Sequence, residues 1–217
     1  AHWTSLGRRS NLRIFVAGHN GMVGSAVVRA IEKGGVHSWF GASRAQLDLL
    51  DRRKVFDFIQ QERPEVVVLA AAVVGGIGAN SSRPVDFLSN NLQIQSNVID
   101  ASHAANVSKL LFLGSSCIYP KHASQPIKEE SLLSGPLEPT NEPYALAKIA
   151  GMKLVEAYRR QFDRKWISAM PTNLYGQNDT YDEKNSHVIP SMIVKFHNAK
   201  IANSESVELW GSGKPLR

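Results

Sequence analysis

The stretch LRIFVAGHNGMVGSAVVRAIEKGG, residues 12–35, decides the fold of this chain. It opens with a run of apolar and β-branched residues, Leu12 to Ala17, which predicts a buried strand. Three glycines follow with the spacing G-x-x-G-x-x-G, and a segment with helical periodicity runs from Met22 to Lys33. Gly34 and Gly35 end this helix. A strand, a glycine-rich turn and a helix in this order are typical of the first unit of a dinucleotide-binding domain.

The rest of the chain repeats the alternation of short apolar runs and longer helical patterns. This order predicts an α/β fold, a doubly wound parallel sheet of the Rossmann type. The clearest buried strand is EVVVLAAA, Glu65 to Ala72, and Asp51 is placed to cap a helix from Arg52 to Gln61. The other expected strands cover residues 36–40, 110–114, 166–170 and 207–210, and the other expected helices cover residues 84–105, 144–162 and 190–202.

The composition is that of an ordinary globular protein, with 43% hydrophobic and 20% charged residues. No apolar run is long enough to span a bilayer, so we expect no membrane partner. Residues 1–10 are polar and basic and are interpreted as a flexible leader rather than a secretory signal. The single cysteine, Cys117, excludes an internal disulfide and a multi-thiolate metal site. Together these features predict a cytoplasmic protein.

The net charge of +6 is spread along the chain rather than gathered into a basic block. Such a distribution is most often a set of solvated helix faces, although it also attracts anionic small molecules such as dinucleotides. No zinc finger or interleaved basic and aromatic pattern is present, and the histidines lack metal-ligand spacing. The sequence therefore predicts neither a nucleic-acid partner nor a metal site.

The glycine turn has a physical role in cofactor binding. Glycine allows the backbone to approach a pyrophosphate, which accepts hydrogen bonds from the N–H groups at the start of the following helix. The residues of the turn that we expect to bind the cofactor are Gly18, His19, Asn20, Gly21, Met22, Val23 and Gly24.

The residues after the second expected strand indicate which dinucleotide is bound. An NAD-binding domain usually carries an acidic residue there, which binds the ribose 2′-OH. Here the sequence is GASR, and the Arg44 guanidinium suits the 2′-phosphate of NADP(H). An ordinary surface arginine is the alternative. Asp48 and the adjacent Leu49 are expected near the adenine, with capping of the following turn as the alternative for Asp48.

Tyr144 and Lys148, in the sequence YALAK, are four residues apart and therefore share one face of a helix. A neighbouring ammonium group lowers the pKa of a tyrosine, which makes its phenol a usable acid near neutral pH. The spacing Y-x-x-x-K is common and mostly structural by itself. Its meaning here comes from the upstream glycine turn and from a strand ending in Gly114-Ser115-Ser116, which places Ser115 beside Tyr144 at a substrate carbonyl.

Four longer stretches of sequence, given at the end of this paragraph, narrow the interpretation to one group of enzymes. Together with the motifs above, these stretches resemble the GDP-L-fucose synthases of the extended short-chain dehydrogenase/reductase family, and the resemblance extends over about Leu12 to Arg217. The resemblance implies NADPH-dependent 3,5-epimerisation and 4-keto reduction of GDP-4-keto-6-deoxy-mannose to GDP-L-fucose. It also implies a homodimer formed through the helices expected over residues 84–105 and 144–162. The stretches are GSSCIYP (114–120), LEPTNEPYALAKIAG (137–151), MPTNLYG (170–176) and SHVIP (186–190).

The resemblance also implies roles for single residues. Ser115, Tyr144 and Lys148 correspond to the reductase triad, and Lys148 also to the residue that holds the nicotinamide ribose. Cys117 and His187 correspond to the acid/base pair that epimerises the carbons beside the ketone. Taken alone, these two would be interpreted as a small buried hydrophobe and a structural histidine. The other implied cofactor residues are Leu113, Gly114, Ser116, Pro171, Thr172, Asn173, Leu174 and His187, and the implied GDP-sugar residues are Lys195, Trp210 and Arg217.

The chain departs from the family in two residues and in length. Asn20 stands where close relatives often carry arginine, and Lys195 replaces a frequent arginine, which keeps the charge but loses the bidentate fork. About two thirds of the family's length is covered. We therefore expect a leader over residues 1–10, an NADP-binding domain over residues 11–176, and the incomplete start of a smaller substrate-binding domain over residues 177–217.

Two other interpretations stay open at this point. Another sugar-nucleotide epimerase or dehydratase of the extended family would carry an acidic residue near Arg44 and no pair equivalent to Cys117 and His187. The other is a truncated, non-catalytic NADP-binding protein. Only the short length favours this interpretation, and the presence of every catalytic-type residue argues against it.

Overall fold

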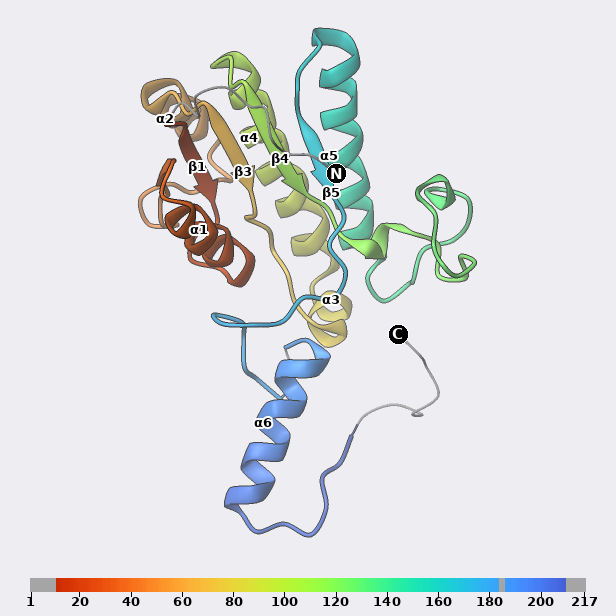
Figure 1. The fold of residues 1–217 in the computed structure, drawn as a ribbon. Coiled ribbons are helices and arrows are strands. Elements are labelled where there is room, and N and C mark those ends of the chain that lie inside the picture. The colour runs from red at the N-terminus through yellow and green to blue at the C-terminus, as the bar shows by residue number, and fades with distance from the viewer. Residues whose placement is uncertain (1–10, 184–185, 210–217) are drawn as a thin grey trace, which may run out of the picture.

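The computed structural model describes residues 11–183 and 186–209. Its centre is a five-stranded parallel sheet with the order β2-β1-β3-β4-β5 (Figure 1). The chain runs outward from β1 to β2 and then crosses back over β1 to reach β3, so the predicted doubly wound topology is confirmed. The strands are β1 (Arg13–Ala17), β2 (Ser38–Phe40), β3 (Val66–Leu69), β4 (Lys109–Leu113) and β5 (Ile167–Ala169).

Helices cover both faces of this sheet. Helix α1 (Met22–Gly34) lies over β1 and β2 on one face. On the other face, α2 (Arg52–Glu62), α4 (Asn91–Ala104) and α5 (Glu142–Phe162) form a layer, and α4 contacts both of the other two helices. Helix α4 is therefore the central helix of this layer.

Alternate residues of the strands supply the two faces of the core. Phe15 and Phe112 are buried under the helix layer, whereas Val16 packs with Val28 of α1 on the opposite face. The edge strand β5 is less well covered, and its Ile167 is 55% exposed. The interior of the sheet is thus fully packed while its β5 edge is partly open.

Two helix ends follow the predicted capping pattern. Helix α1 stops at Gly35, which adopts a left-handed conformation with φ of 61°. Helix α2 begins after Asp51, whose carboxylate accepts a hydrogen bond from the backbone N–H of Lys54 at 3.1 Å. Both predictions from the sequence are confirmed.

The structure differs from the expected elements around residues 77–105. A short helix, α3 (Ile77–Ser82), was not expected, and the segment Asp86–Asn90 forms a π-helical turn before α4. In a regular α-helix the Phe87 carbonyl would accept from the backbone N–H of Asn91. Here that N–H donates to the Leu88 carbonyl, and the Phe87 carbonyl accepts from the side-chain amide of Asn91 at 2.7 Å.

The expected strand over residues 207–210 is wrong for the part that the structure describes. Residues 207–209 form no strand, because no other strand of the described chain pairs with them. Residue Trp210 lies outside the described residues.

Helix α6 (Val188–Ile201) extends away from the sheet and its covering helices (Figure 1). Pro190 is its buried residue, whereas Val188, Phe196 and Ile201 are 64%, 49% and 69% exposed. Its apolar side chains are therefore largely uncovered. None of the helices in residues 11–183 and 186–209 combines the length and the apolar character needed to cross a membrane.

Candidate active site

The carboxyl ends of the parallel strands all point toward α3 and α6 (Figure 1). A cavity of about 890 Å³ opens at this edge of the sheet. Its walls come from the glycine turn, the loops after β2 and β3, the end of β4, the start of α5 and the segment after β5. Open α/β sheets bind ligands where the strand order reverses, and that point lies beside β1 in this cavity.

The glycine turn is built for close approach of backbone to backbone. Gly18 has φ of +88°, and a Cβ there would lie 2.7 Å from the backbone nitrogen of Ala71. A Cβ at Gly24 would lie 2.0 Å from the Gly18 carbonyl oxygen. Helix α1 begins without a side-chain cap, and Met22 and Val23 line the cavity. The first N–H groups of α1 are therefore available to an anion.

His19 and Asn20 do not line the cavity, although Gly18, Gly21 and Gly24 do. The His19 ring packs closely on the residue that follows β2, since a Cβ at Gly41 would lie 2.2 Å from its Nδ1. That ring also lies 5.9 Å from the ring of Trp39, centroid to centroid. Asn20 is exposed.

The loop after β2 forms one end of the cavity. Arg44, Asp48 and Leu49 all line it. The Asp48 carboxylate accepts a hydrogen bond from the backbone N–H of Leu50 at 3.1 Å. Asp48 therefore caps its own turn, which was the alternative to an adenine contact.

Tyr144 and Lys148 line the cavity from the first turns of α5. The Lys148 ammonium donates a hydrogen bond to the Leu113 carbonyl at 2.8 Å and lies 5.6 Å from the centroid of the Tyr144 ring. Burial lowers the pKa of Lys148 to about 8, although the neighbouring Cys117 opposes this change.

Burial raises the pKa of Tyr144, and the neighbouring Cys117 raises it further. The expectation that Lys148 lowers the pKa of Tyr144 is therefore wrong for this structure. The physical reason is that removing the phenolate from water outweighs the attraction of a lysine that is itself buried. The phenol is fully protonated at neutral pH.

Ser115 lines the cavity just after the end of β4. Its Oγ accepts a hydrogen bond from the backbone N–H of Cys117 at 3.4 Å. Cys117 is half-buried beside Tyr144 and Lys148, without lining the cavity itself. Burial raises the pKa of the Cys117 thiol, while Ser115 and Lys148 act in the opposite direction.

The segment after β5 also lines the cavity. His187, the residue that precedes α6, lines it together with Leu113, Gly114 and the run Pro171, Thr172, Asn173 and Leu174. Ser116 does not line it, and neither does Lys195, whose ammonium donates to the Glu208 carbonyl at 3.1 Å. Trp210 and Arg217 lie outside the described residues.

Sequence reasoning missed the wall that follows β3. Residues 70–75 line the cavity there, as does Phe87, whose ring lies edge-on to Tyr144 at 6.3 Å between centroids. The buried Asn91 holds this wall, because its amide accepts from the Val73 N–H at 2.8 Å and donates to the Val73 carbonyl at 3.0 Å. The sequence did contain a signal for this wall. In a parallel sheet, the loop after the third strand must lie at the same edge as the glycine turn after the first strand.

The described ranges, 11–183 and 186–209, contain no cluster of three or more His, Cys, Asp or Glu side chains that could hold a metal ion. The polar side chains that line the cavity include a phenol, an ammonium, hydroxyls, an imidazole and two guanidinium groups, together with carboxylates and amides. This set suits a ligand that carries phosphates and a carbonyl group.

The chain resembles several known proteins over nearly its whole length. It is 55% identical to the GDP-L-fucose synthase of Escherichia coli strain K12 over 208 residues, which are 96% of this chain and 65% of that protein. It is 40% identical to the GDP-L-colitose synthase of Yersinia pseudotuberculosis, with 95% of this chain and 67% of that protein covered. A solved GDP-L-fucose synthetase from Naegleria fowleri bound to NADP matches with a TM-score of 0.84 and 30% identity, over 97% of this chain and 68% of that one.

The chain thus spans 65% of the length of the Escherichia coli protein. Residues 14–217 match the model of the NAD dependent epimerase/dehydratase family. The match includes the glycine turn, the cavity after the parallel strands and the helix that carries Tyr144 and Lys148. The chain belongs to the NAD dependent epimerase/dehydratase family.

Proposed function

We propose that this chain carries the cofactor-binding and catalytic part of a cytoplasmic, NADPH-dependent sugar-nucleotide enzyme. The reaction is 3,5-epimerisation and 4-keto reduction of GDP-4-keto-6-deoxy-mannose to GDP-L-fucose. The observation that carries the proposal is the meeting of Ser115, Tyr144 and Lys148 with the glycine turn in one cavity. The 55% identity to a GDP-L-fucose synthase supports the choice of substrate.

The cavity fits an NADP-type dinucleotide. Gly18 and Gly24 allow the turn to pack backbone against backbone, because a Cβ at either residue would overlap with backbone atoms. The start of α1 has no side-chain cap, so its N–H groups are available to a pyrophosphate. Arg44 lines the nucleotide end and provides a cation for a 2′-phosphate. When bound, NADPH supplies the hydride that reduces the ketone.

The reduction needs a proton donor at the carbonyl oxygen, and Tyr144 is placed to be that donor. Its raised pKa keeps the phenol protonated at neutral pH, which suits a reaction in the reducing direction. The Ser115 oxygen accepts from the Cys117 N–H, so the serine's own proton is available to the same carbonyl. The Lys148 ammonium lies near enough to stabilise the phenolate that forms.

The epimerisation needs an acid and a base on the two sides of the sugar ring, because the ketone acidifies the C–H bonds beside it. We assign these roles to Cys117 and His187. Cys117 lies next to Tyr144 and Lys148, and His187 lines the same cavity from the start of α6. His187 thus comes from a segment far away in the sequence, whereas Cys117 follows Ser115 by two residues and does not itself line the cavity.

A second candidate is another GDP-linked sugar as substrate, which the 40% identity to a GDP-L-colitose synthase favours. The two candidates use the same proton donor and differ in the sugar that fits the cavity. Comparing turnover of the two sugar nucleotides at equal concentration separates them.

We also propose the two-part organisation expected from the sequence, with a cofactor domain over residues 11–176 and the start of a substrate-binding domain over residues 177–217. The exposed apolar side chains of α6 support it, since they leave a surface for further structure. We also propose a homodimer through residues 84–105 and 144–162, which include α4 and α5. A monomer in light scattering would contradict the dimer.

The proposed function is tested by following the absorbance of NADPH with GDP-4-keto-6-deoxy-mannose as substrate and separating the products by chromatography. Turnover to GDP-L-fucose is the expected result. NADPH binding without turnover of either sugar nucleotide would contradict the enzymatic function and support a cofactor-binding protein.

Replacing Arg44 by alanine is expected to weaken NADPH binding by about 10- to 100-fold, since a hydrogen-bonded ion pair contributes about 1.5–3 kcal/mol. Binding of NADH, which lacks the 2′-phosphate, should hardly change. Fluorescence titration with both dinucleotides measures the two constants. Arg53→Ala serves as the control, because Arg53 is exposed and does not line the cavity. An equal loss for NADPH and NADH would show that Arg44 does not read the phosphate.

The value of kcat/KM is expected to fall as the pH rises through about 8, the pKa of Lys148. The lysine is charged below this pH and neutral above it, and the neutral form cannot stabilise the Tyr144 phenolate. Tyr144 and Cys117 have raised pKa values, so they titrate at higher pH. Lys148→Arg should retain this charge and move the descending limb to higher pH. A wild-type profile that stays flat through this range would contradict the role of Lys148.

A further inference from the structure

Helix α4 carries three buried amide side chains that the proposed chemistry does not use. Asn91, Gln95 and Asn97 are only 2%, 3% and 5% exposed. Burying an amide without a partner costs free energy, so such groups are expected to be hydrogen-bonded. Each of the three reaches out of its own helix to a main-chain carbonyl of a different segment, and each of these segments contributes residues to the cavity wall.

Gln95 contacts the helix that carries the catalytic pair. Its Nε2 donates a hydrogen bond to the carbonyl of Ala147, which lies between Tyr144 and Lys148 in α5. The two helices approach closely at this level, since a Cβ at Gly151 would lie 2.5 Å from the Gln95 Oε1. This contact therefore joins α4 to the turn of α5 that carries the phenol and the ammonium.

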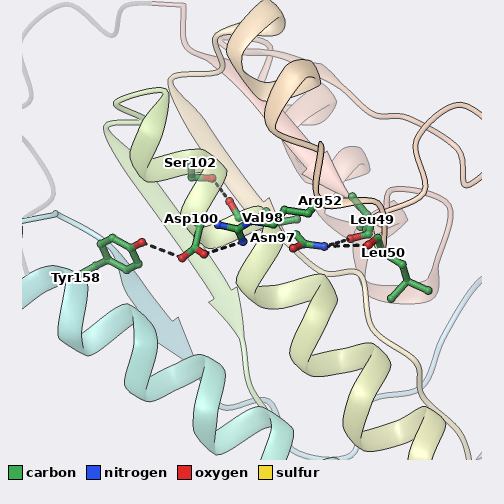
Figure 2. A network of polar contacts seen from close by, with 8 residues as sticks. All are labelled: Leu49, Leu50, Arg52, Asn97, Val98, Asp100, Ser102 and Tyr158. Carbon is green, nitrogen blue, oxygen red and sulfur yellow. Dashed lines mark hydrogen bonds and ion pairs between the residues drawn. The ribbon is translucent and has the colours of Figure 1, made fainter. Parts of the chain in front are cut away.

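Asn97 contacts the opposite end of the cavity. Its Nδ2 donates to the Leu49 carbonyl at 2.9 Å and to the Leu50 carbonyl at 3.3 Å (Figure 2). These two residues belong to the loop that also places Arg44 in the cavity wall. One turn further along α4, Asp100 accepts from Tyr158 at 2.8 Å, so α4 is tied to α5 here as well.

We propose that the buried amides of α4 are positioning residues for the reaction, with Gln95 acting on the catalytic helix and Asn97 on the nucleotide-binding loop. Asn91 holds the wall between them through Val73. The inference rests on the proposed function. Because the two contacts lie at different ends of the cavity, loss of each one affects a different step.

Replacing Gln95 by methionine removes the hydrogen bond and retains the length of the side chain. We expect kcat to fall about 10-fold, since a small displacement of a catalytic group is costly, while the Kd for NADPH stays within about twofold. Replacing Asn97 by leucine should do the reverse, raising the Kd for NADPH about 10-fold and leaving kcat at saturating cofactor unchanged.

The matched control is Ser102→Ala. Ser102 is fully buried in the same helix, but its Oγ donates to the Val98 carbonyl within α4 at 2.7 Å (Figure 2). Its loss should lower the melting temperature without moving either the Kd or kcat. Should an apolar variant fail to fold, Gln95→Asn and Asn97→Ser keep a neutral polar side chain but shorten it, so that it no longer reaches the carbonyl across the helix interface.

Fluorescence titration with NADPH, steady-state kinetics and thermal unfolding are measured on all variants. The proposal is supported if Gln95→Met lowers mainly kcat and Asn97→Leu raises mainly the Kd for NADPH. A loss of stability alone does not produce these two different effects. Parallel losses in both constants that follow the melting temperature would overturn it, as would wild-type values in both variants. If the wild type binds NADPH but does not turn over the sugar nucleotide, the proposed function fails, and the titration of the Asn97 variants still decides positioning at the nucleotide end.

Discussion

Tyr144→Phe is expected to lower kcat for ketone reduction by about 10²–10⁴-fold, the usual contribution of a positioned proton donor. The variant retains the aromatic ring that lies edge-on to Phe87, so the wall of the cavity and the binding of NADPH should be preserved. Product formation in steady state and a fluorescence titration with NADPH measure the two properties separately.

Tyr175→Phe is the control for this experiment. Tyr175 is 64% exposed and does not line the cavity, so its substitution should change neither property. Activity of Tyr144→Phe within about tenfold of the wild type would mean that a different group donates the proton. The Ser115 hydroxyl would then be the next candidate, because its own proton is available.

Gly24→Ala is expected to weaken NADPH binding by more than about 100-fold. The new Cβ would lie 2.0 Å from the Gly18 carbonyl oxygen, 2.7 Å from the Gly18 carbonyl carbon and 2.9 Å from the His19 Cα. All three are backbone atoms, so no side chain can move aside and the turn itself must open. Overpacking of this kind costs about 1–3 kcal/mol or more, and 3 kcal/mol corresponds to more than about 100-fold in Kd.

Gly34→Ala is the matched control in the same helix. A Cβ at Gly34 would meet no atom within 4 Å, so the variant should bind NADPH normally and gain about 0.5–1 kcal/mol of stability from the better helix former. Titration and thermal unfolding of both variants test the pair. Normal NADPH binding by Gly24→Ala would show that the glycine turn is not the pyrophosphate site.

Much of the fold could be predicted because it is recorded in local patterns. The strand, glycine turn and helix over residues 13–34 lie together in the sequence, and β3 is a short run of valines and leucine. The spacing of Tyr144 and Lys148 places them on one helix face regardless of the surroundings. Each of these inferences depends on residues that are near one another along the chain.

What could not be predicted depends on contacts between distant segments. The buried amide of Gln95 meets Ala147, 52 residues away, and no periodicity marks a glutamine for that contact. The direction in which the pKa of Tyr144 moves depends on how deeply α5 is buried. The π-helical turn before α4 lies where Asn91 bonds to Phe87 and to Val73 of a separate loop.

The all-parallel sheet has a consequence for how the protein folds. Ile14 pairs with Val66 and Leu111 with Ile167, so no hairpin can start the sheet and every pairing must wait for a long loop to close. The three-residue strand β5, at the edge and partly exposed, is expected to join last and to open first. Pro171 to Leu174 follow β5, whereas the glycine turn follows β1 inside the sheet. On folding, the protein is therefore expected to form the proposed binding site for the adenine nucleotide before the proposed site of hydride transfer. On unfolding, it should lose the two sites in the reverse order.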